Sequence, residues 1–301
     1  MRIAVFGAGA LGSVVGGLLS RRNEVTLIGR SAHMQAIEHN GLVVGGMVEA
    51  VFVPQAVSEV GQVHEVDIVI VTVKAYDTLE ALEAVRPLLD KGAVLVLLQN
   101  GLRQLTVMSE GHIGSVIGIT SIGATYVSPG KVVYTGIGGT YFGSLSGATE
   151  QAERIADMFT SVGLDSEVPL DIRREVWAKA VINASINPIT ALVRCRNGGV
   201  LKNEGLLALS ELLCDEGVSV ARAQGIDLSA EQTFEKVLEV LRRTAENRSS
   251  MLQDMERGKR TEVDDINGEI VRLGKEKGID AHANLALTLL IEGLSAQNSR
   301  R

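Results

Sequence analysis

The chain has 301 residues, of which 46% are hydrophobic and 22% charged, and its formal net charge is −7. This length predicts about two domains, each able to bury a core. The acidic balance disfavours a general nucleic-acid binder, which needs a basic surface. The first residues form no basic leader before an apolar segment, and no apolar run reaches the ~20 residues of a membrane span. We therefore expect a cytoplasmic protein that is not bound to a membrane.

The first half of the chain alternates strand-like and helix-like segments. Residues 67–73 are the most apolar of them, a nearly continuous β-branched run that is typical of a strand buried on both faces of a sheet. Strands that alternate with helices predict βαβ units and a parallel sheet. In order, we expect a strand at residues 2–6, a helix at 10–21, strands at 24–28 and 67–73, a helix at 78–89 and a strand at 93–98.

Residues 115–143 differ in texture from the segments before them. Gly residues and a Ser-Pro-Gly turn separate short β-rich pieces at 116–120, 131–135 and 140–142. We expect these pieces to close one side of the sheet, some of them in antiparallel direction, before one more helix at residues 149–162.

Beyond Asp171 the sequence becomes mostly helical. Apolar residues recur at three- and four-residue spacing in residues 204–224, 230–255 and 262–277, which predicts three helices. We place a domain boundary near Pro169, with an α/β domain over residues 1–168 and an all-α domain over residues 169–301.

A glycine-rich loop follows the first strand directly and opens the first helix. Its pattern is GxGxxG, in which the first glycine makes a tight turn, the second admits a pyrophosphate and the third lets the helix pack on the strand. The N–H groups of the helix N-terminus favour phosphate. The loop predicts a Rossmann-type dinucleotide-binding domain and consists of Gly7, Ala8, Gly9, Ala10, Leu11 and Gly12.

The end of the second strand indicates which dinucleotide binds. NAD sites usually carry Asp or Glu there, whereas NADP sites often carry Arg. This chain has Arg30, whose guanidinium can hold a 2′-phosphate by two hydrogen bonds, and Ser31 can add another. The alternative is that Arg30 is a solvated surface charge, and His33 fits an ordinary helix residue.

The start of the second domain carries polar residues at helical spacing. Lys179, Asn183 and Asn187 lie at i, i+4 and i+8, so they share one face of a helix among Ala, Val and Ile. Polar groups buried there each need a partner, so the face is either a functional site or the solvent side of an amphipathic helix. Pro188 disfavours helical geometry at Asn187, where we expect the helix to end or kink.

A second polar cluster lies near the end of the chain. Asn247, Ser250 and Asp254 fall on one face of the helix expected at residues 230–255. Thr261-Glu262-Val263-Asp264 then matches the [ST]-x-x-[DE] pattern of a capping box. Acids favour a helix N-terminus, so Glu262 is either an ordinary acid of a first helical turn or part of a site.

Two further polar residues follow buried strands of the first domain. Lys74 follows the strand at 67–73, and Asn100 follows the strand at 93–98. Ligands of open α/β sheets bind at the carboxyl ends of the strands, so both residues either face a ligand or are an ordinary loop lysine and a turn-forming Asn-Gly. The five histidines are scattered without ligand spacing, and we expect no metal site.

Together, these motifs resemble the ketopantoate reductase family over essentially the whole chain. The resemblance implies NADPH-dependent reduction of ketopantoate to pantoate, a step of pantothenate (coenzyme A) biosynthesis. It also implies that the helical domain is similar to the C-terminal domain of 6-phosphogluconate dehydrogenase. The segments that carry it are the loop at 7–12, Thr72-Val73-Lys74-Ala75, Gln99-Asn100-Gly101, and residues 177–191, 247–254 and 261–268.

The resemblance implies roles for individual residues. Lys179 would be the general acid that protonates the carbonyl oxygen, and Glu262 would keep it oriented. The implied cofactor residues are the loop Gly7–Gly12 with Arg30, Lys74 and Asn100. The implied substrate residues are Asn100, Asn183, Asn187, Asn247 and Ser250.

Three alternatives remain open at this point. A related reductase could take another 2-oxoacid, and a 3-hydroxyacid dehydrogenase of the 6-phosphogluconate type also uses a helical Lys-x-x-x-Asn. A non-catalytic NADP(H)-sensing protein would need the cofactor loop but not Lys179, Asn183 and Glu262 together. We expect a small-molecule partner, no nucleic acid, and a homodimer formed through the helical domain.

Overall fold

The computed structural model describes residues 1–109 and 115–298. It divides into two compact units, residues 1–99 with 104–172 (unit 1) and residues 100–103 with 173–301 (unit 2). The boundary that we predict at 168/169 differs from this division, which falls after Ile172. The short segment Asn100–Arg103 groups with unit 2, although it follows a strand of unit 1.

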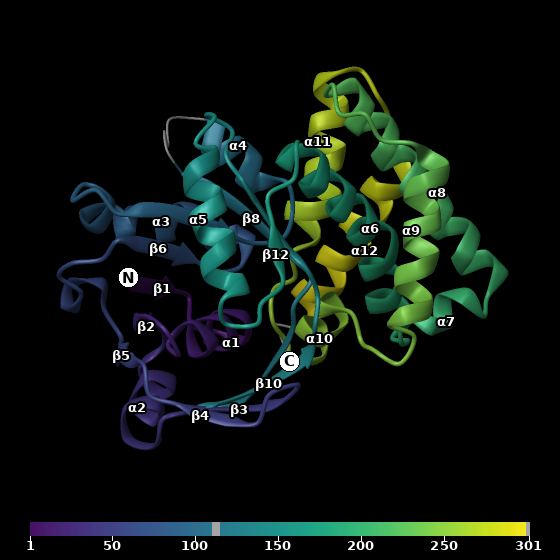
Figure 1. The fold of residues 1–301 in the computed structure, drawn as a ribbon. Helices are drawn as coiled ribbons and strands as arrows, with labels where there is room; N and C mark the ends of the chain where they lie inside the picture. Colours follow the sequence, from purple (N-terminus) through teal and green to yellow (C-terminus); the bar gives the residue numbers. More distant parts are fainter. Residues whose placement is uncertain (110–114, 299–301) are drawn as a thin grey trace. The chain divides into compact units, whose positions relative to one another are not determined.

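Unit 1 is built on an eight-stranded sheet of order β12-β11-β8-β7-β6-β1-β2-β5 (Figure 1). The pairs are parallel except for β11 with β8, and the sheet confirms the parallel α/β prediction. Its strands are β1 (Arg2–Phe6), β2 (Glu24–Ile28), β5 (Gln55–Val57), β6 (Ile68–Val71), β7 (Val94–Leu98), β8 (Val116–Thr120), β11 (Thr140–Gly143) and β12 (Ser166–Glu167).

The core of unit 1 lies between this sheet and its helices. Every residue of β6 is buried, and Val5 of β1 and Leu27 of β2 are fully covered. These aliphatic strands pair side by side, with Ile3 opposite both Val25 and Ile68. The helices are α1 (Ala10–Leu19), α2 (Ser31–Asn40), α3 (Thr78–Leu89), α4 (Arg103–Ser109) and α5 (Thr149–Thr160), with 3-10 turns η1 (Val60–Gln62) and η2 (Ala75–Asp77).

A second sheet of four strands was not predicted. It has the order β4-β3-β10-β9 and consists of β3 (Leu42–Gly46), β4 (Ala50–Phe52), β9 (Gly123–Ser128) and β10 (Lys131–Gly136). We expected residues 131–135 to close the main sheet, and this was wrong. They pair instead with β3 in parallel and with β9 in antiparallel direction.

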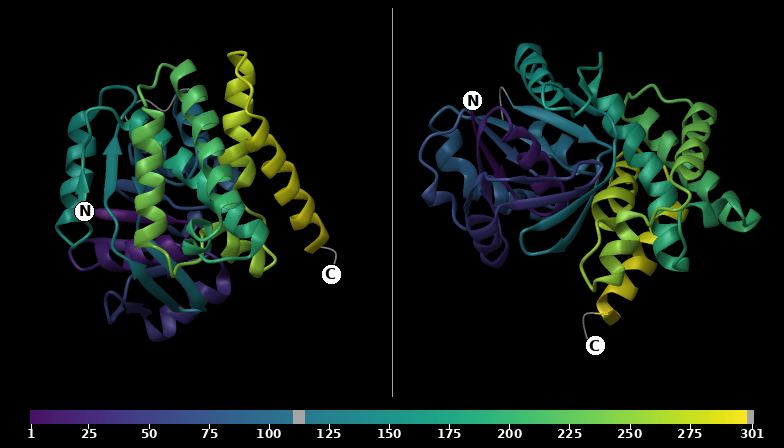
Figure 2. Two further views of the ribbon diagram at one scale, coloured as in Figure 1. Left: turned by 90° about the vertical axis from the view of Figure 1, so that its right-hand side faces the viewer. Right: turned by 60° about the horizontal axis from the view of Figure 1, so that its bottom comes forward.

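Unit 2 is helical, as predicted. Its last helix, α12, was not foreseen, and it ends near the C-terminus (yellow in Figure 2). The helices are α6 (Ile172–Val193), α7 (Gly198–Leu201), α8 (Glu204–Ala223), α9 (Ala230–Arg243), α10 (Ser250–Glu256), α11 (Glu269–Glu276) and α12 (His282–Asn298), with the π-helical turn η3 (Asp264–Gly268) before α11.

The single helix that we expected at residues 230–255 is two helices. α9 ends at Arg243 and α10 starts at Ser250, with Ser249 as its N-cap, whose Oγ accepts a hydrogen bond from Leu252 N at 3.1 Å. Thr244 caps the end of α9 and accepts a hydrogen bond from Asn197 Nδ2 at 2.8 Å. Capping side chains therefore break the helix where its apolar spacing alone would continue it.

α6 continues past Pro188 to Val193, so the helix does not end at Asn187 as we expected. Proline has no N–H to donate to the carbonyl four residues back. That carbonyl, of Ala184, instead accepts a hydrogen bond from Asn267 Nδ2 at 3.1 Å. By length and composition α6 could cross a membrane, but 72% of its apolar window is buried inside the protein. It is the core helix of unit 2.

Candidate active site

The loop between β1 and α1 has the geometry that a dinucleotide requires. Gly7 has a φ of +93°, and a Cβ on it would lie 2.6 Å from Val73 Cγ1; a Cβ on Gly12 would lie 2.4 Å from Thr72 Oγ1. Packing therefore fixes these two glycines. A Cβ on the exposed Gly9 would meet only Gly7 O, at 3.8 Å. The space beside Gly9 fits the close approach of a pyrophosphate to the backbone.

Arg30 lies directly after β2 and is the N-cap residue of α2. Its side chain is exposed, and it forms no hydrogen bond or ion pair with the described residues. A guanidinium in this state is available to a phosphate. The strand end and the residue type both fit the 2′-phosphate of NADP.

His33, one turn into α2, connects three parts of unit 1. Its Nδ1 accepts a hydrogen bond from Gly130 N at 2.9 Å, and its Nε2 lies 2.9 Å from Ser13 Oγ. Because Nδ1 accepts, the ring is neutral and Nε2 carries the proton. Burial lowers the pKa of His33 and favours this neutral form. The imidazole thus holds α2, which begins just after Arg30, against α1.

Lys74 follows β6 and is the half-buried N-cap residue of η2. Thr72, two residues earlier, donates its hydroxyl to Gly7 O at 2.9 Å and ties this segment to the glycine loop. β1 pairs with both β2 and β6. The glycine loop, Arg30 and Lys74 therefore follow three neighbouring strands at their carboxyl ends, where open α/β sheets bind ligands.

In unit 2, a hydrogen-bonded network joins Lys179 to two residues from distant parts of the sequence. Lys179 Nζ donates to Asn100 Oδ1 at 3.0 Å, and Asn100 Nδ2 donates to Glu262 Oε2 at 3.4 Å. Lys179 and Asn100 are half-buried, and Glu262 is 4% exposed. The amide of Asn100 thus lies between a cation and an anion, with each end facing the charge that it can bind.

The surroundings make Lys179 a weaker base than an exposed lysine. Desolvation lowers the pKa of Lys179 to about 8, although the negative charge of Glu262 acts in the opposite direction. An ammonium group with such a pKa is still charged near neutral pH and loses its proton more easily than usual. These are the properties of a general acid.

The other candidate residues of unit 2 lie on α6 and at the start of α10. Asn183 is half-buried and Asn187 is 7% exposed on the same helix as Lys179. Ser250 is the first residue of α10 and is exposed. Thr190 Oγ1 lies 2.8 Å from Ser249 Oγ, so the start of α10 contacts α6 one turn beyond Asn187.

Asn247 and Glu262 are placed differently from the sequence-based expectation. Asn247 lies in the break between α9 and α10, exposed, and not on one helix face with Ser250 and Asp254. The expected capping box is also wrong, because Val263 precedes η3 as its N-cap residue and no side-chain hydrogen bond caps it. Glu262 instead points to Asn100 and so becomes part of the network with Lys179.

Sequence analysis missed an ion pair beside this network. Arg103 Nη1 donates to Asp265 Oδ1 at 3.0 Å, and only 2% of the Asp265 side chain is exposed. The only sign of it in the sequence is that Asp265 directly follows another acid, Asp264, and precedes the apolar Ile266. An adjacent pair of acids is ordinary on the surface of a helix, so the pattern alone does not separate a buried carboxylate from a solvated one.

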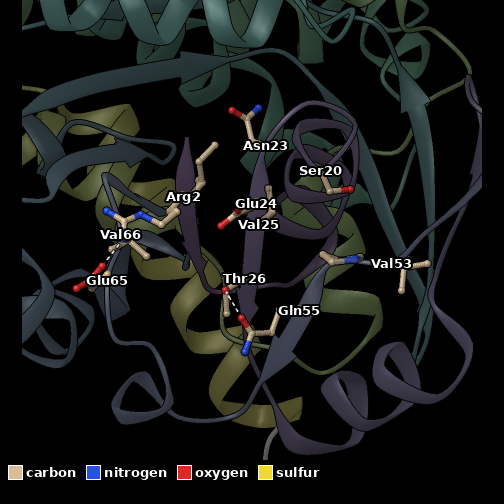
Figure 3. A pocket seen from close by; sticks show the side chains of 12 residues that line it. Arg2, Ser20, Asn23, Glu24, Val25, Thr26, Val53, Gln55, Glu65 and Val66 are labelled. Carbon is tan, nitrogen blue, oxygen red and sulfur yellow. Dashed lines mark hydrogen bonds and ion pairs between the residues drawn. The ribbon is translucent and has the colours of Figure 1, made fainter.

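A pocket of about 370 Å³ in unit 1 is separate from all candidate site residues (Figure 3). Arg2 and Glu24 line it at the amino ends of β1 and β2, together with Thr26, which donates to Gln55 Oε1 at 3.0 Å. The glycine loop lies at the opposite ends of the same strands. This pocket is therefore not part of the candidate dinucleotide site.

Family models match most of the chain. The model described as "Ketopantoate reductase PanE/ApbA" matches residues 3–147, and "Ketopantoate reductase PanE/ApbA C terminal" matches residues 171–295. The 2-dehydropantoate 2-reductase of Archaeoglobus fulgidus is 41% identical over 297 residues, which cover 98% of each chain. That of Pyrococcus abyssi is 36% identical and covers all of both chains.

Solved structures are similar over nearly the full length. A PanE/ApbA family ketopantoate reductase from Ralstonia eutropha has a TM-score of 0.91 and 31% identity, with 99% of each chain covered. A D-mandelate dehydrogenase in complex with NADH and anilino(oxo)acetate has a TM-score of 0.94 and 26% identity, also with 99% coverage of each chain. Both similarities extend across the two units.

Proposed function

The chain belongs to the ketopantoate reductase family, and we propose that it reduces the keto group of ketopantoate (2-dehydropantoate) to the alcohol of pantoate with NADPH. Relatives of this name match it over its full length. It is an NADP-dependent oxidoreductase that acts on the CH–OH group of a small molecule. The observation that carries the proposed mechanism is the network of Lys179, Asn100 and Glu262.

The cofactor residues of the proposal lie in unit 1. The loop Gly7–Gly12 and the start of α1 would hold the pyrophosphate, Arg30 the 2′-phosphate, and Lys74 a further part of the cofactor. The open space beside Gly9 and the available guanidinium of Arg30 support this assignment. When bound, NADPH supplies the hydride for the keto carbon.

Lys179 would supply the proton that the reduction needs. As the keto carbon becomes tetrahedral, its oxygen gains negative charge and must be protonated or stabilised by a cation. Lys179 Nζ would donate that proton and become a neutral amine, which the lowered pKa of about 8 favours. Glu262 would keep the ammonium form populated beforehand, and Asn100 would orient the amine through the hydrogen bond at 3.0 Å.

The remaining polar residues of unit 2 would bind the ends of the substrate. Ketopantoate has a carboxylate and a hydroxyl group besides its keto group, and amide and hydroxyl side chains bind both. Asn183 and Asn187 share a helix with Lys179, and Ser250 begins a helix whose N-cap contacts α6. Asn247 is part of the proposal as well, although it lies outside α10.

A second substrate is supported by one similarity. The D-mandelate dehydrogenase structure matches this fold with a TM-score of 0.94 and holds NADH with anilino(oxo)acetate, an oxoacid analogue. A 2-oxoacid with a bulkier apolar side chain is therefore the second candidate. The same network around Lys179 would serve either substrate, since both present a keto group beside a carboxylate.

The test is the loss of NADPH absorbance with ketopantoate, compared with pyruvate, 2-oxoisovalerate and the 2-oxoacid of mandelate, each also with NADH. Turnover with ketopantoate well above that with the other acids supports the proposal. Faster turnover with the 2-oxoacid of mandelate would make that acid the proposed substrate in place of ketopantoate. NADPH binding without any turnover would favour a sensing protein. Homodimerisation and a cytoplasmic location stay predictions, and light scattering after gel filtration checks the first.

A further inference from the structure

The segment Asn100–Arg103 is joined to the π-helical turn η3 by two hydrogen bonds and packs closely against it at Gly101. Leu102 N donates to Asp265 O at 3.3 Å, and Arg103 Nη1 donates to Asp265 Oδ1 at 3.0 Å. Gly101 has a φ of +82°, and a Cβ on it would lie 2.6 Å from Asp265 O. Both the backbone and the side chain of Asp265 therefore hold the residues that directly follow Asn100.

The ion pair between Arg103 and Asp265 is not an ordinary surface pair. The Asp265 side chain is 2% exposed, and its Oδ2 is buried without a hydrogen-bond partner among the described residues. Burial raises the pKa of Asp265 to about 6, and the positive charge of Arg103 opposes this rise. Arg103 also begins α4, where the helix dipole disfavours a cation. The contact thus joins a carboxylate that is unfavourably buried to a cation that lies unfavourably at a helix N-terminus.

The ion pair lies close in sequence to Asn100, whose orientation determines whether its amide can bind both Lys179 and Glu262. The Asn100 amide turns its oxygen to the Lys179 amine and its nitrogen to Glu262. A flipped amide would direct its N–H groups at the lysine N–H groups and its oxygen at the Glu262 carboxylate, so both hydrogen bonds would be lost. A tether on the following residues restricts this movement.

We propose that Arg103 and Asp265 are positioning residues for the reduction, and that their ion pair holds Asn100 in the orientation that binds Lys179 and Glu262. The proposal rests on the proposed function of Lys179 as the acid. No hydrogen bond or ion pair among the described residues joins Arg103 or Asp265 to Lys179, so the pair acts through Asn100. Loss of the pair should therefore affect the chemical step, whereas the glycine loop, Arg30 and Lys74, which would make the other contacts to NADPH, belong to unit 1 and are unchanged.

The test compares Asp265→Asn, Arg103→Gln and the double variant with the wild type. Displacement of a positioned group by about 1 Å costs up to ~100-fold in rate, and we expect each single variant to lose about tenfold in kcat with an unchanged Kd for NADPH. Residues that act as one pair are not additive, so the double variant should lose no more than either single variant. Arg272→Gln, which removes the ion pairs that this partly exposed arginine forms with Glu269 and Glu276 of the same unit, is the matched control and should keep its kcat.

A second readout does not depend on turnover. Hydrogen exchange of the peptide that contains residues 100–103 should become faster in Asp265→Asn and Arg103→Gln, and not in the control. Unchanged kcat and unchanged exchange in folded variants would overturn the proposal, as would single losses that simply add in the double variant. A wild type that fails to reduce ketopantoate would instead contradict the proposed function, while faster exchange in the variants would still support the tether.

Discussion

Replacement of Glu262 by Gln is expected to shift the alkaline limb of the pH–rate profile to lower pH. Lys179 can donate a proton only in its charged form, and its pKa of about 8 is the result of desolvation, which lowers it, and of Glu262, which raises it. Glu262→Gln keeps the size of the side chain and removes its charge. The pKa of Lys179 should then fall further, because only the lowering effect remains.

The magnitude follows from the short path between the two groups. The Asn100 amide is hydrogen-bonded to both groups, with contacts of 3.0 Å and 3.4 Å, and a charge so near shifts a pKa by about 1 unit or more. A pKa that falls from about 8 by about 1 unit lowers the charged fraction at about pH 7.5 from roughly three quarters to roughly one quarter. The activity that this charge supports should drop about threefold there, and the difference should vanish near pH 6, where both forms are fully protonated.

The assay is kcat/KM for ketopantoate with saturating NADPH between about pH 6 and pH 10. Asp264→Asn is the control, since it removes an exposed acid two residues away that does not contribute to the pKa shift of Lys179. A limb that stays in place in Glu262→Gln, or moves to higher pH, would refute the reasoning. A limb that moves equally in the control would show that general charge, and not Glu262, sets the pKa.

Three further predictions address the two units. Lys179→Ala should fold and bind NADPH but lose about 100-fold or more in kcat, measured by steady-state kinetics; near wild-type turnover would remove Lys179 from the proposed mechanism. Arg30→Ala should weaken NADPH binding about tenfold or more and leave NADH binding nearly unchanged, as titration calorimetry can measure, because a charge-assisted hydrogen bond contributes about 1.5–3 kcal/mol; equal losses would mean that Arg30 does not bind the 2′-phosphate. Asn267→Leu should destabilise unit 2 by about 3 kcal/mol, since it leaves the buried Ala184 carbonyl and Asn284 Oδ1 without their donor; a thermal melt within about one degree of the wild type would contradict this.

Local sequence patterns predicted the elements that depend on local physics. The strands β1 and β2 and the helix α3 begin and end at the residues that their apolar spacing and glycines indicate. Local patterns do not predict the position of a segment that is determined by pairing with a distant part of the chain. β10 joins the second sheet because it pairs with β3, far earlier in the chain. The alternation of apolar residues in β10 predicts a strand, but it does not indicate which strand β10 pairs with.

The same distinction applies to breaks in helices. α6 passes through Pro188 because Asn267, which lies in another helix, supplies the donor that proline lacks. α9 stops where Thr244 binds Asn197 of a preceding loop. In both cases the local rule is correct about the energetic cost, and a side chain from elsewhere in unit 2 decides the outcome.

The candidate site divides in a similar way. Lys179, Asn100 and Glu262 were singled out from residue type and family resemblance, and hydrogen bonds join all three. Their roles stay predictions. Asp265 and its partner Arg103 could not be predicted, because it is the burial of Asp265 that makes the pair unusual, and a single sequence does not reveal which of two adjacent acids is buried.

The assignment of Asn100–Arg103 to unit 2 has a consequence for recombination between relatives. A hybrid gene with one crossover near residue 170 would take Arg103 from one parent and Asp265 from the other. Such a hybrid could inherit two intact halves and still combine a positive residue with a partner that carries no charge. Compatible parents are therefore those that carry the same residues at these two positions. The activity of a hybrid from mismatched parents should be restored when residues 100–103 are exchanged for those of the parent that supplies Asp265.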